Sequence, residues 1–146
     1  MYDDSITGDA GANSLDGGSG DDTLIGGDAV DRLSGGGGQD TLTGGNEADG
    51  FVFFGINTIG DAPDYILDFS QTDGDIIDLE RFEGYSGAET FSFLGQADFT
   101  GEKWQLRYAQ TGGETIVSGD IDGDGAADFE IHCLGTIDFT AGDFLL

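Results

Sequence analysis

Residues 8–52 repeat a pattern of nine positions in which one large apolar residue returns at a fixed place. Written in rows, the segment reads GDAGANSLD, GGSGDDTLI, GGDAVDRLS, GGGGQDTLT and GGNEADGFV. Position one is always glycine, and position eight is always large and apolar: Leu15, Leu24, Leu33, Leu42 and Phe51. Upstream, Asp4 and Ile6 occupy positions six and eight of a partial row. So few apolar residues among so many glycines exclude an amphipathic helix.

The row pattern predicts very short strands joined by turns. The end of each row forms a strand whose middle side chain points inward while its neighbours point outward. The start of each row turns the chain, with glycines supplying the positive φ angles that other residues avoid. Two rows then make one coil, and stacked coils form two parallel sheets around a ladder of leucines. Such a solenoid is stable only when several units stack.

Position six adds acidic columns to this picture, because it holds Asn13, Asp22, Asp31, Asp40 and Asp49. Turns on one side recur every second row. We therefore expect a first column of Asp4, Asp22 and Asp40, and a second column of Asn13, Asp31 and Asp49. One buried leucine contributes about 1.5–3 kcal/mol, whereas ordering the backbone costs about 1–2 kcal/mol per residue. The leucine ladder alone therefore cannot stabilise the coils. Stacked carboxylates offer only oxygen ligands, and such ligands favour a calcium ion between them.

The rows resemble the RTX ("repeats in toxin") family, whose unit G-G-x-G-x-D-x-U-x forms a calcium-binding β-roll. The resemblance implies that each inner Asp bridges two calcium ions and that backbone carbonyls of positions one to four complete the shells. It places ions between loops 8–13 and 26–31, between 17–22 and 35–40, and between 26–31 and 44–49. A further ion would lie between Asp4 and loop 17–22. A Gly-rich linker is the alternative, but it has no reason to keep leucine and aspartate in register.

This resemblance implies a long set of ligand positions. Asn13 replaces the usual aspartate and weakens the site at its end of the roll. Ala29 and Glu47 replace the usual glycine of position four. The implied positions are Asp4, Gly8, Asp9, Ala10, Gly11, Asn13, Gly17, Gly18, Ser19, Gly20, Asp22, Gly26, Gly27, Asp28, Ala29, Asp31, Gly35, Gly36, Gly37, Gly38, Asp40, Gly44, Gly45, Asn46, Glu47 and Asp49.

Beyond the rows, aromatic residues replace glycines and longer strands are expected. The sequence predicts strands near 51–54, 65–69, 75–79, 103–108, 115–118 and 129–134. The strands over 103–108 and 129–134 alternate, with Trp104, Leu106 and Tyr108 on one face and Phe129, Ile131 and Cys133 inward. We therefore predict an all-β chain with a parallel β-roll over residues 1–52. Residues 53–146 would form an antiparallel, sandwich-like cap.

The cap resembles the C-terminal domain of serralysin-type metalloproteases through FVFF, DYILDF, GDIIDL, GDIDGDGAADFEI and TAGDFLL. Similar modules follow lipases and alginate epimerases. The resemblance implies export by a type I secretion machine, which consists of an ABC transporter, an adaptor and an outer-membrane channel. The segment Asp143–Leu146 matches the family's acidic-then-apolar terminus, although an ordinary last strand would look the same.

Two further acidic groups are candidate calcium sites. Asp120, Asp122, Asp124 and Asp128 follow D-x-D-x-D-G spacing, which brings alternate acids together in a tight turn. A polar hairpin tip is the alternative, because Asp-Gly pairs favour turns. Asp64 and Asp75, together with Asp68 and Asp78, form the second group near the end of the roll.

The net charge of −26, from 30 acids and four bases, argues against nucleic acid and anionic lipid as partners. The single Cys133 excludes a disulfide framework, and no stretch has the length of a membrane span. The single His132 and the missing H-E-x-x-H motif leave no zinc protease site. Trp104 is a possible sugar platform, but a core position is the more ordinary role for a tryptophan.

The sequence therefore predicts a secreted, extracellular, non-catalytic module that binds several calcium ions. Met1 falls inside a repeat and no N-terminal signal peptide is visible, so we expect the C-terminal part of a larger exported protein. We expect the module to fold in calcium-rich medium and to help its upstream domain to fold. No membrane insertion is expected. The alternative is a polysaccharide-binding module of a carbohydrate-active enzyme, and four bases offer little to an anionic polymer.

Overall fold

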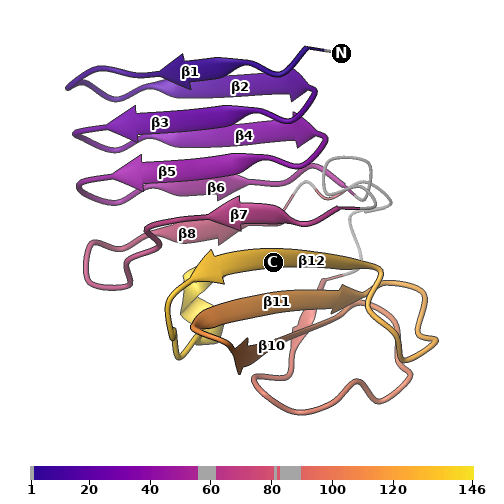
Figure 1. Ribbon diagram of the computed structural model, residues 1–146. Coiled ribbons are helices and arrows are strands. Elements are labelled where there is room, and N and C mark those ends of the chain that lie inside the picture. Colours follow the sequence, from indigo (N-terminus) through magenta and orange to yellow (C-terminus); the bar gives the residue numbers. More distant parts are fainter. Residues whose placement is uncertain (1, 56–61, 81, 83–89) are drawn as a thin grey trace.

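The structure is a computed structural model, and it describes residues 2–55, 62–80, 82 and 90–146. This described part is built of strands and one short 3-10 helix (Figure 1). The elements are β1 Ser5–Thr7, β2 Ser14–Ser19, β3 Thr23–Gly27, β4 Arg32–Gly37, β5 Thr41–Gly45, β6 Gly50–Val52, β7 Asp64–Ile66, β8 Ile76–Asp78, β9 Ser92–Phe93, β10 Gln105–Thr111, β11 Glu114–Asp120, β12 Phe129–Leu134, η1 Ala141–Asp143 and β13 Phe144–Leu145. No described helix has the length and apolar character of a membrane span.

The nine-residue rows form a parallel β-roll, which confirms the predicted fold. Strands β1, β3 and β5 stack in one sheet, while β2, β4 and β6 stack in the other. Among these six strands, paired residues are 18 positions apart, as in Leu24 with Leu42 and Leu15 with Leu33. Two rows therefore make one coil, and the coils lie one above another in Figure 1.

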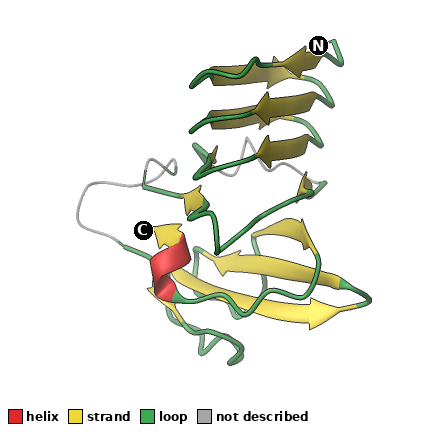
Figure 2. Cartoon of the chain, turned by 90° about the vertical axis from the view of Figure 1, so that its left-hand side faces the viewer, coloured by secondary structure: helices red, strands yellow, loops and turns green. Residues whose placement is uncertain are grey.

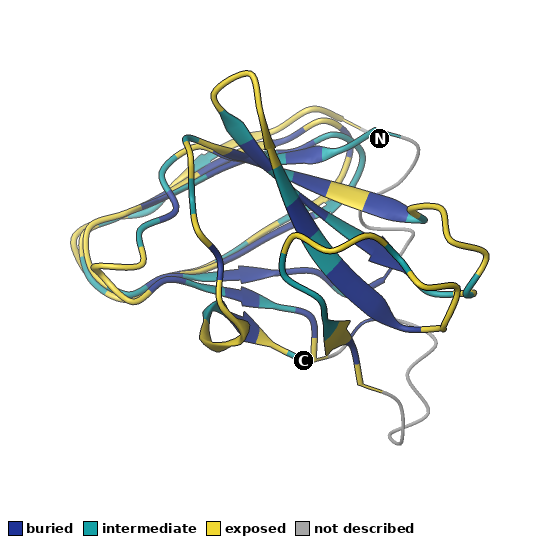
Figure 3. Cartoon of the chain, turned by 90° about the horizontal axis from the view of Figure 1, so that it is seen from below, coloured by how far each residue is buried: buried dark blue, intermediate teal, exposed yellow. Residues whose placement is uncertain are grey.

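The apolar ladder of the rows lies between the two sheets. Four side chains of the ladder are fully buried: Leu24, Leu33, Leu42 and Phe51. Leu15, near the N-terminal end of the roll, is only partly buried. Seen from below in Figure 3, buried residues lie mainly on the strands and exposed residues gather in the loops. The ladder continues into an aromatic core near the C-terminal end, so roll and cap share one hydrophobic cluster.

Both sheets continue past residue 52, the point at which the sequence predicted a change of domain. Strand β7 pairs in parallel with β5, and β8 pairs in parallel with β6. The antiparallel strands β10, β11 and β12 then join the first sheet through β7, giving the order β1-β3-β5-β7-β12-β11-β10-β9. Figure 2 shows them below the stacked coils. The antiparallel strands thus extend one sheet of the roll, because β7 offers an unpaired edge.

The chain ends against the roll. Strand β13 pairs in parallel with β8, so Phe144 lies opposite Ile77 and Leu145 lies opposite Asp78. The Phe144 side chain is buried, whereas Leu145 is exposed at 47%. The terminal residues therefore form an edge strand of the five-stranded sheet β13-β8-β6-β4-β2.

Candidate metal centre

The first column is a ladder of carboxylates and backbone amides. The N–H of Asp4 donates to Oδ1 of Asp22 at 2.7 Å, and the N–H of Asp22 donates to Oδ1 of Asp40 at 2.8 Å. The N–H of Asp40 then donates to Oδ1 of Asp64 at 2.7 Å. Asp64, from the second acidic group that the sequence suggested, is therefore the next member of the first column.

The second column has the same construction on the other side of the roll. The N–H of Asn13 donates to Oδ1 of Asp31 at 2.7 Å, and the N–H of Asp31 donates to Oδ1 of Asp49 at 2.8 Å. The N–H of Asp49 donates to Oδ1 of Asp75 at 2.9 Å. Asp75 thus continues the second column, while Asn13 at its start is partly exposed.

The second oxygen of most column carboxylates is buried without a partner. Among the described residues, Oδ2 has no hydrogen-bond donor in five of these side chains: Asp22, Asp31, Asp40, Asp49 and Asp64. A buried carboxylate oxygen without a donor is costly, and buried charges are normally paired or bound to metal. Of the features described, these oxygens are the strongest indication that the columns bind a cation.

The glycine at position one lets this oxygen approach a carbonyl of the next coil. A Cβ added at Gly17 would collide with Oδ2 of Asp22 and would lie 2.6 Å from the carbonyl oxygen of Gly35. At Gly26 it would collide with Oδ2 of Asp31 and lie 2.5 Å from the carbonyl oxygen of Gly44. Carboxylate and carbonyl oxygens from neighbouring coils thus converge, and hard oxygen ligands suit calcium. The residues present fit the ion.

Burial makes these carboxyl groups hard to ionise without a cation. Desolvation raises the pKa of Asp40 and of Asp49 to about 6, and neighbouring carboxylates add to the rise. Desolvation raises the pKa of Asp64 to about 8 and also raises the pKa of Asp75. In each case a backbone hydrogen bond partly opposes the effect.

Many of the remaining predicted row positions lie at the ends of strands, although the sequence predicted that the start of each row turns the chain. Residues 17–19 end β2, 26–27 end β3, 35–37 end β4 and 44–45 end β5. These segments contact the coil two rows away, as in the 2.8 Å bond from the Gly20 N–H to the Gly37 carbonyl. Asp28 accepts a bond from the Asn46 side chain at 2.7 Å. Asp68 accepts the N–H groups of Gly44 and Gly45, each at 2.9 Å. That role of Asp68 has no signal in the row pattern.

The sequence did not single out a third, outer line of polar contacts. The N–H of Asp21 donates to Asp3 at 3.1 Å, and the N–H of Gln39 donates to Asp21 at 2.9 Å. These residues stand at position five, which carries no consistent residue type in the other rows. The exposed side chains of Asp3 and Asp21 accept these bonds and so link neighbouring coils from outside the columns.

The D-x-D-x-D-G loop brings three of its four acids together. Carboxylate oxygens of Asp120, Asp122 and Asp124 lie within 4.8 Å of one another. Both oxygens of Asp120 accept amides of the same loop, from Gly123 at 2.7 Å and Gly125 at 2.9 Å. Asp128 instead accepts the N–H of Ile121 at 2.7 Å. The self-bonded loop fits the hairpin-tip interpretation as well as a calcium site.

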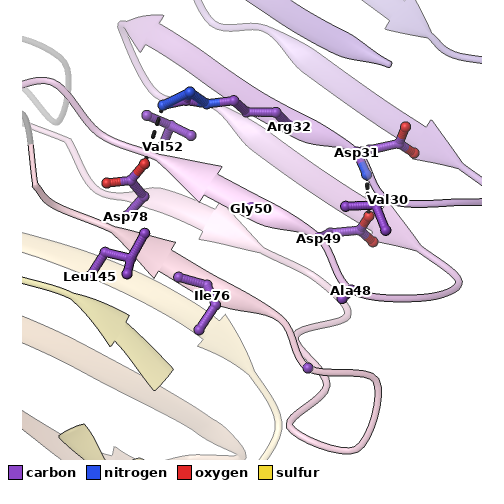
Figure 4. A pocket seen from close by; sticks show the side chains of 11 residues that line it. Val30, Asp31, Arg32, Ala48, Asp49, Gly50, Val52, Ile76, Asp78 and Leu145 are labelled. Atoms are coloured by element: carbon purple, nitrogen blue, oxygen red, sulfur yellow. Dashed lines mark hydrogen bonds and ion pairs between the residues drawn. The ribbon is translucent and has the colours of Figure 1, made fainter. Parts of the chain in front are cut away.

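A pocket of about 350 Å³ lies on the outer face of the five-stranded sheet (Figure 4). Gly50 has no side chain there, while Val52, Ile76 and Leu145 supply apolar walls. Arg32 lines the pocket and pairs with Asp78 at 3.2 Å. The pocket is therefore mainly aliphatic with one ion pair at its wall.

Three residues weighed in the sequence lie away from the columns. Trp104 is buried edge-on against Phe91, with ring centroids 5.3 Å apart, so its role is in the core. Cys133 is fully buried, and this burial raises the pKa of its thiol, which makes it unreactive. His132 lies on the opposite face of β12, as strand alternation predicted.

Stacked two-row coils with paired columns of buried aspartates define a β-roll module of the RTX, calcium-binding type. The family model "Peptidase M10 serralysin C terminal" matches residues 4–146. The chain therefore belongs to the serralysin C-terminal family, as the sequence indicated.

Two solved structures support the assignment. The AlgE6R3 subunit of a mannuronan C5-epimerase from Azotobacter vinelandii matches with a TM-score of 0.68 and 27% identity, over 98% of this chain and 78% of that chain. The AlgE6R2 subunit of the same epimerase matches with a TM-score of 0.62 and 28% identity, over 96% of this chain and 91% of that one. A comparison with curated proteins gives no significant match.

Proposed function

We propose that this chain is a non-catalytic module that folds when calcium fills its aspartate columns. The observation that carries the proposal is the set of buried Oδ2 atoms without partners, in columns on both sides of the roll. A bound calcium ion supplies positive charge between these carboxylates. The chain itself supplies the oxygens, holds them in register through the amide ladder, and excludes water.

The net charge of −26 makes this folding conditional. Such self-repulsion opposes a compact state unless cations neutralise it. Extracellular calcium modules bind in the range of about 10⁻⁴–10⁻³ M. Cytosolic calcium lies far below that range, so we expect an unfolded chain inside the cell and a folded one outside.

The test is a circular-dichroism titration of the whole chain with calcium and, separately, with magnesium. We expect a disordered spectrum in chelator and a β spectrum on adding calcium. Magnesium should fail at equal concentration because it keeps its waters and demands a tighter site. A stable β spectrum in excess chelator would contradict the switch.

We further propose that the C-terminal residues carry an export signal for a type I machine of ABC transporter, adaptor and outer-membrane channel. Strand β13 has β8 as its only strand partner among the described elements, and β8 is a strand of the roll. Before calcium binds, that docking surface is absent and the terminus is accessible. The protein would then be secreted, and its folded roll would assist an upstream domain.

A passenger fused ahead of the whole chain, in a strain with a matching exporter, tests this role. Deleting residues 143–146 should lower the amount of passenger in the medium while calcium-induced folding persists. Leu67→Ala, a change of an exposed apolar residue just after β7, is the control and should leave secretion unaltered. Secretion unaffected by the deletion would place the signal elsewhere.

The pocket around Arg32 favours a second candidate function, the binding of a polysaccharide. The epimerase subunits that share this fold belong to an enzyme named for mannuronan. Arg32 would meet a carboxylate and the aliphatic wall would meet a sugar ring. Mannuronan oligomers should then bind the calcium-loaded chain and lose affinity in Arg32→Ala. Equal binding by both proteins would remove this candidate.

A further inference from the structure

The outer face of the eight-stranded sheet holds His132 between two carboxylates. His132 and Glu130 point to the same side of β12, and Glu114 lies at the start of the neighbouring strand β11. The strand register puts Ile116 on one side of His132 and Tyr65 on the other. The Tyr65 ring lies 5.2 Å from the imidazole, and the His132 side chain is only 15% exposed.

Glu114 determines which imidazole nitrogen carries the hydrogen. Nδ1 of His132 lies 3.1 Å from Oε2 of Glu114. An ionised carboxylate only accepts hydrogen bonds, so Nδ1 is the donor. In the neutral ring the lone pair is then on Nε2.

Nε2 faces a second carboxylate without a hydrogen bond. Among the described residues it has no hydrogen-bond partner, and it is shielded from solvent. Oε2 of Glu130 lies 3.5 Å away. Two lone pairs in this position repel each other unless a cation lies between them. Ligands about 2.0–2.2 Å from a tetrahedral zinc ion lie about 3.3–3.6 Å apart, so the spacing suits that ion.

We propose that Nε2 of His132 and Oε2 of Glu130 bind a zinc ion, with water completing its shell. Glu114 would be a positioning residue, because metal-bound histidines usually donate their other N–H to a carboxylate. Imidazole with carboxylate suits zinc, whereas the oxygen-only columns suit calcium, so the two sites are chemically distinct. The Glu130 side chain is 46% exposed, so an ion bound to its Oε2 has solvent on that side.

A single histidine makes the test direct, because all imidazole signals come from His132. The whole chain, labelled with ¹⁵N at histidine and saturated with millimolar calcium, is titrated with zinc chloride. Saturating calcium keeps zinc from the acidic columns. We expect the Nε2 resonance to shift on zinc binding while Nδ1 stays protonated.

Three variants assign the ligands. Glu130→Gln should lower zinc affinity at least tenfold, and Glu114→Gln should lower it by about 10–100-fold. Glu102→Gln, at an exposed loop position, is the control and should bind zinc as the parent does. Each substitution is close in shape and lies at the surface, and the calcium-loaded dichroism spectrum checks folding.

Two results would overturn the zinc site. One is an Nε2 resonance that zinc does not move at any concentration short of precipitation. The other is equal zinc affinity in Glu130→Gln and the parent, which would show binding elsewhere. A ring found protonated on both nitrogens at pH 7.5, and unchanged by zinc, would show that a proton occupies the place assigned to the metal.

Discussion

At the residue scale, a comparison of Gly18 with Gly36 distinguishes the cost of backbone strain from the cost of disturbing the stacked coils. Both stand at position two of a row, with φ of 96° and 101°. A Cβ on Gly18 would meet no atom within 4 Å, whereas one on Gly36 would collide with the carbonyl oxygen of Gly18 and lie 2.8 Å from its carbonyl carbon. The two sites therefore share a conformation and differ in what lies above them.

We expect Gly36→Ala to destabilise the calcium-loaded protein more than Gly18→Ala. The left-handed conformation costs about 1–2 kcal/mol in either variant, and only Gly36→Ala also forces two coils apart. Urea unfolding in saturating calcium measures the difference. Equal losses would mean that the coils do not stack as closely as described.

Asp31 and Asn13 belong to one column but differ in surroundings. Oδ1 of Asp31 accepts the N–H of Asn13 at 2.7 Å, and its Oδ2 is buried without a partner in the described structure. Oδ1 of Asn13 accepts the N–H of Asp9 within its own turn at 2.9 Å. Asp31→Ala should raise the calcium midpoint of folding clearly, while Asn13→Ala should raise it little. Equal midpoints from the two titrations would refute the column model.

The position-six aspartates could be predicted from the sequence because leucine and aspartate keep a common register. Asp64 and Asp75 were harder to place, since they lie 24 and 26 residues after their column neighbours instead of 18. Ala29 and Glu47 have φ of 68° and 77°. The row pattern normally has glycine at these positions, and that glycine is the only sequence signal of a positive φ there. Side-chain type alone does not reveal such backbone angles.

At the scale of elements, the columns should respond to pH in opposite ways with and without calcium. The pKa values of Asp40 and Asp49 are raised to about 6, and that of Asp64 is raised to about 8. Without a cation, their protonation therefore favours the fold. This contribution is fully present below about pH 4 and is lost as pH rises through 6 to 8.

In calcium-free buffer we expect β signal to grow as pH falls from 8 to about 4. In calcium the ion competes with protons, so the calcium midpoint should rise as pH falls below about 6. Circular dichroism at fixed calcium and varied pH measures both effects. A calcium midpoint that does not change between pH 5 and pH 7.5 would mean that these carboxylates do not bind the ion.

Strand positions could be predicted from alternation, as for β12, whose bounds Phe129–Leu134 were expected. The partner of β12 could not be predicted, because alternation shows which face is buried and not which edge is free. The structure pairs it with β7 of the roll. That pairing makes one continuous sheet where the sequence indicated a separate cap.

At the scale of the whole molecule, roll and cap should fold as one unit. Their buried residues form a single cluster that runs from Leu24 to Phe144. Phe51 is fully buried at the junction and packs near Phe69, with ring centroids 6.2 Å apart. Trp104, the single tryptophan, is buried in the antiparallel part and reports on it.

Phe51→Ala should lower the free energy of unfolding by about 3–5 kcal/mol. It should also shift the fluorescence transition of Trp104 together with the dichroism transition. Ile25→Ala, at a side chain exposed by 39%, is the control and should shift neither by much. Both transitions are followed by urea unfolding in calcium. A Trp104 transition that stays in place would show that the antiparallel strands fold alone.

The central claim is that calcium converts an expanded acidic chain into the compact β-roll. Small-angle X-ray scattering tests it directly, because the radius of gyration depends on the size of the whole chain. For 146 residues, we expect about 40 Å in chelator and about 15 Å in millimolar calcium, with no such change in magnesium. A radius near 15 Å in chelator, or one that calcium leaves unchanged, would contradict the account.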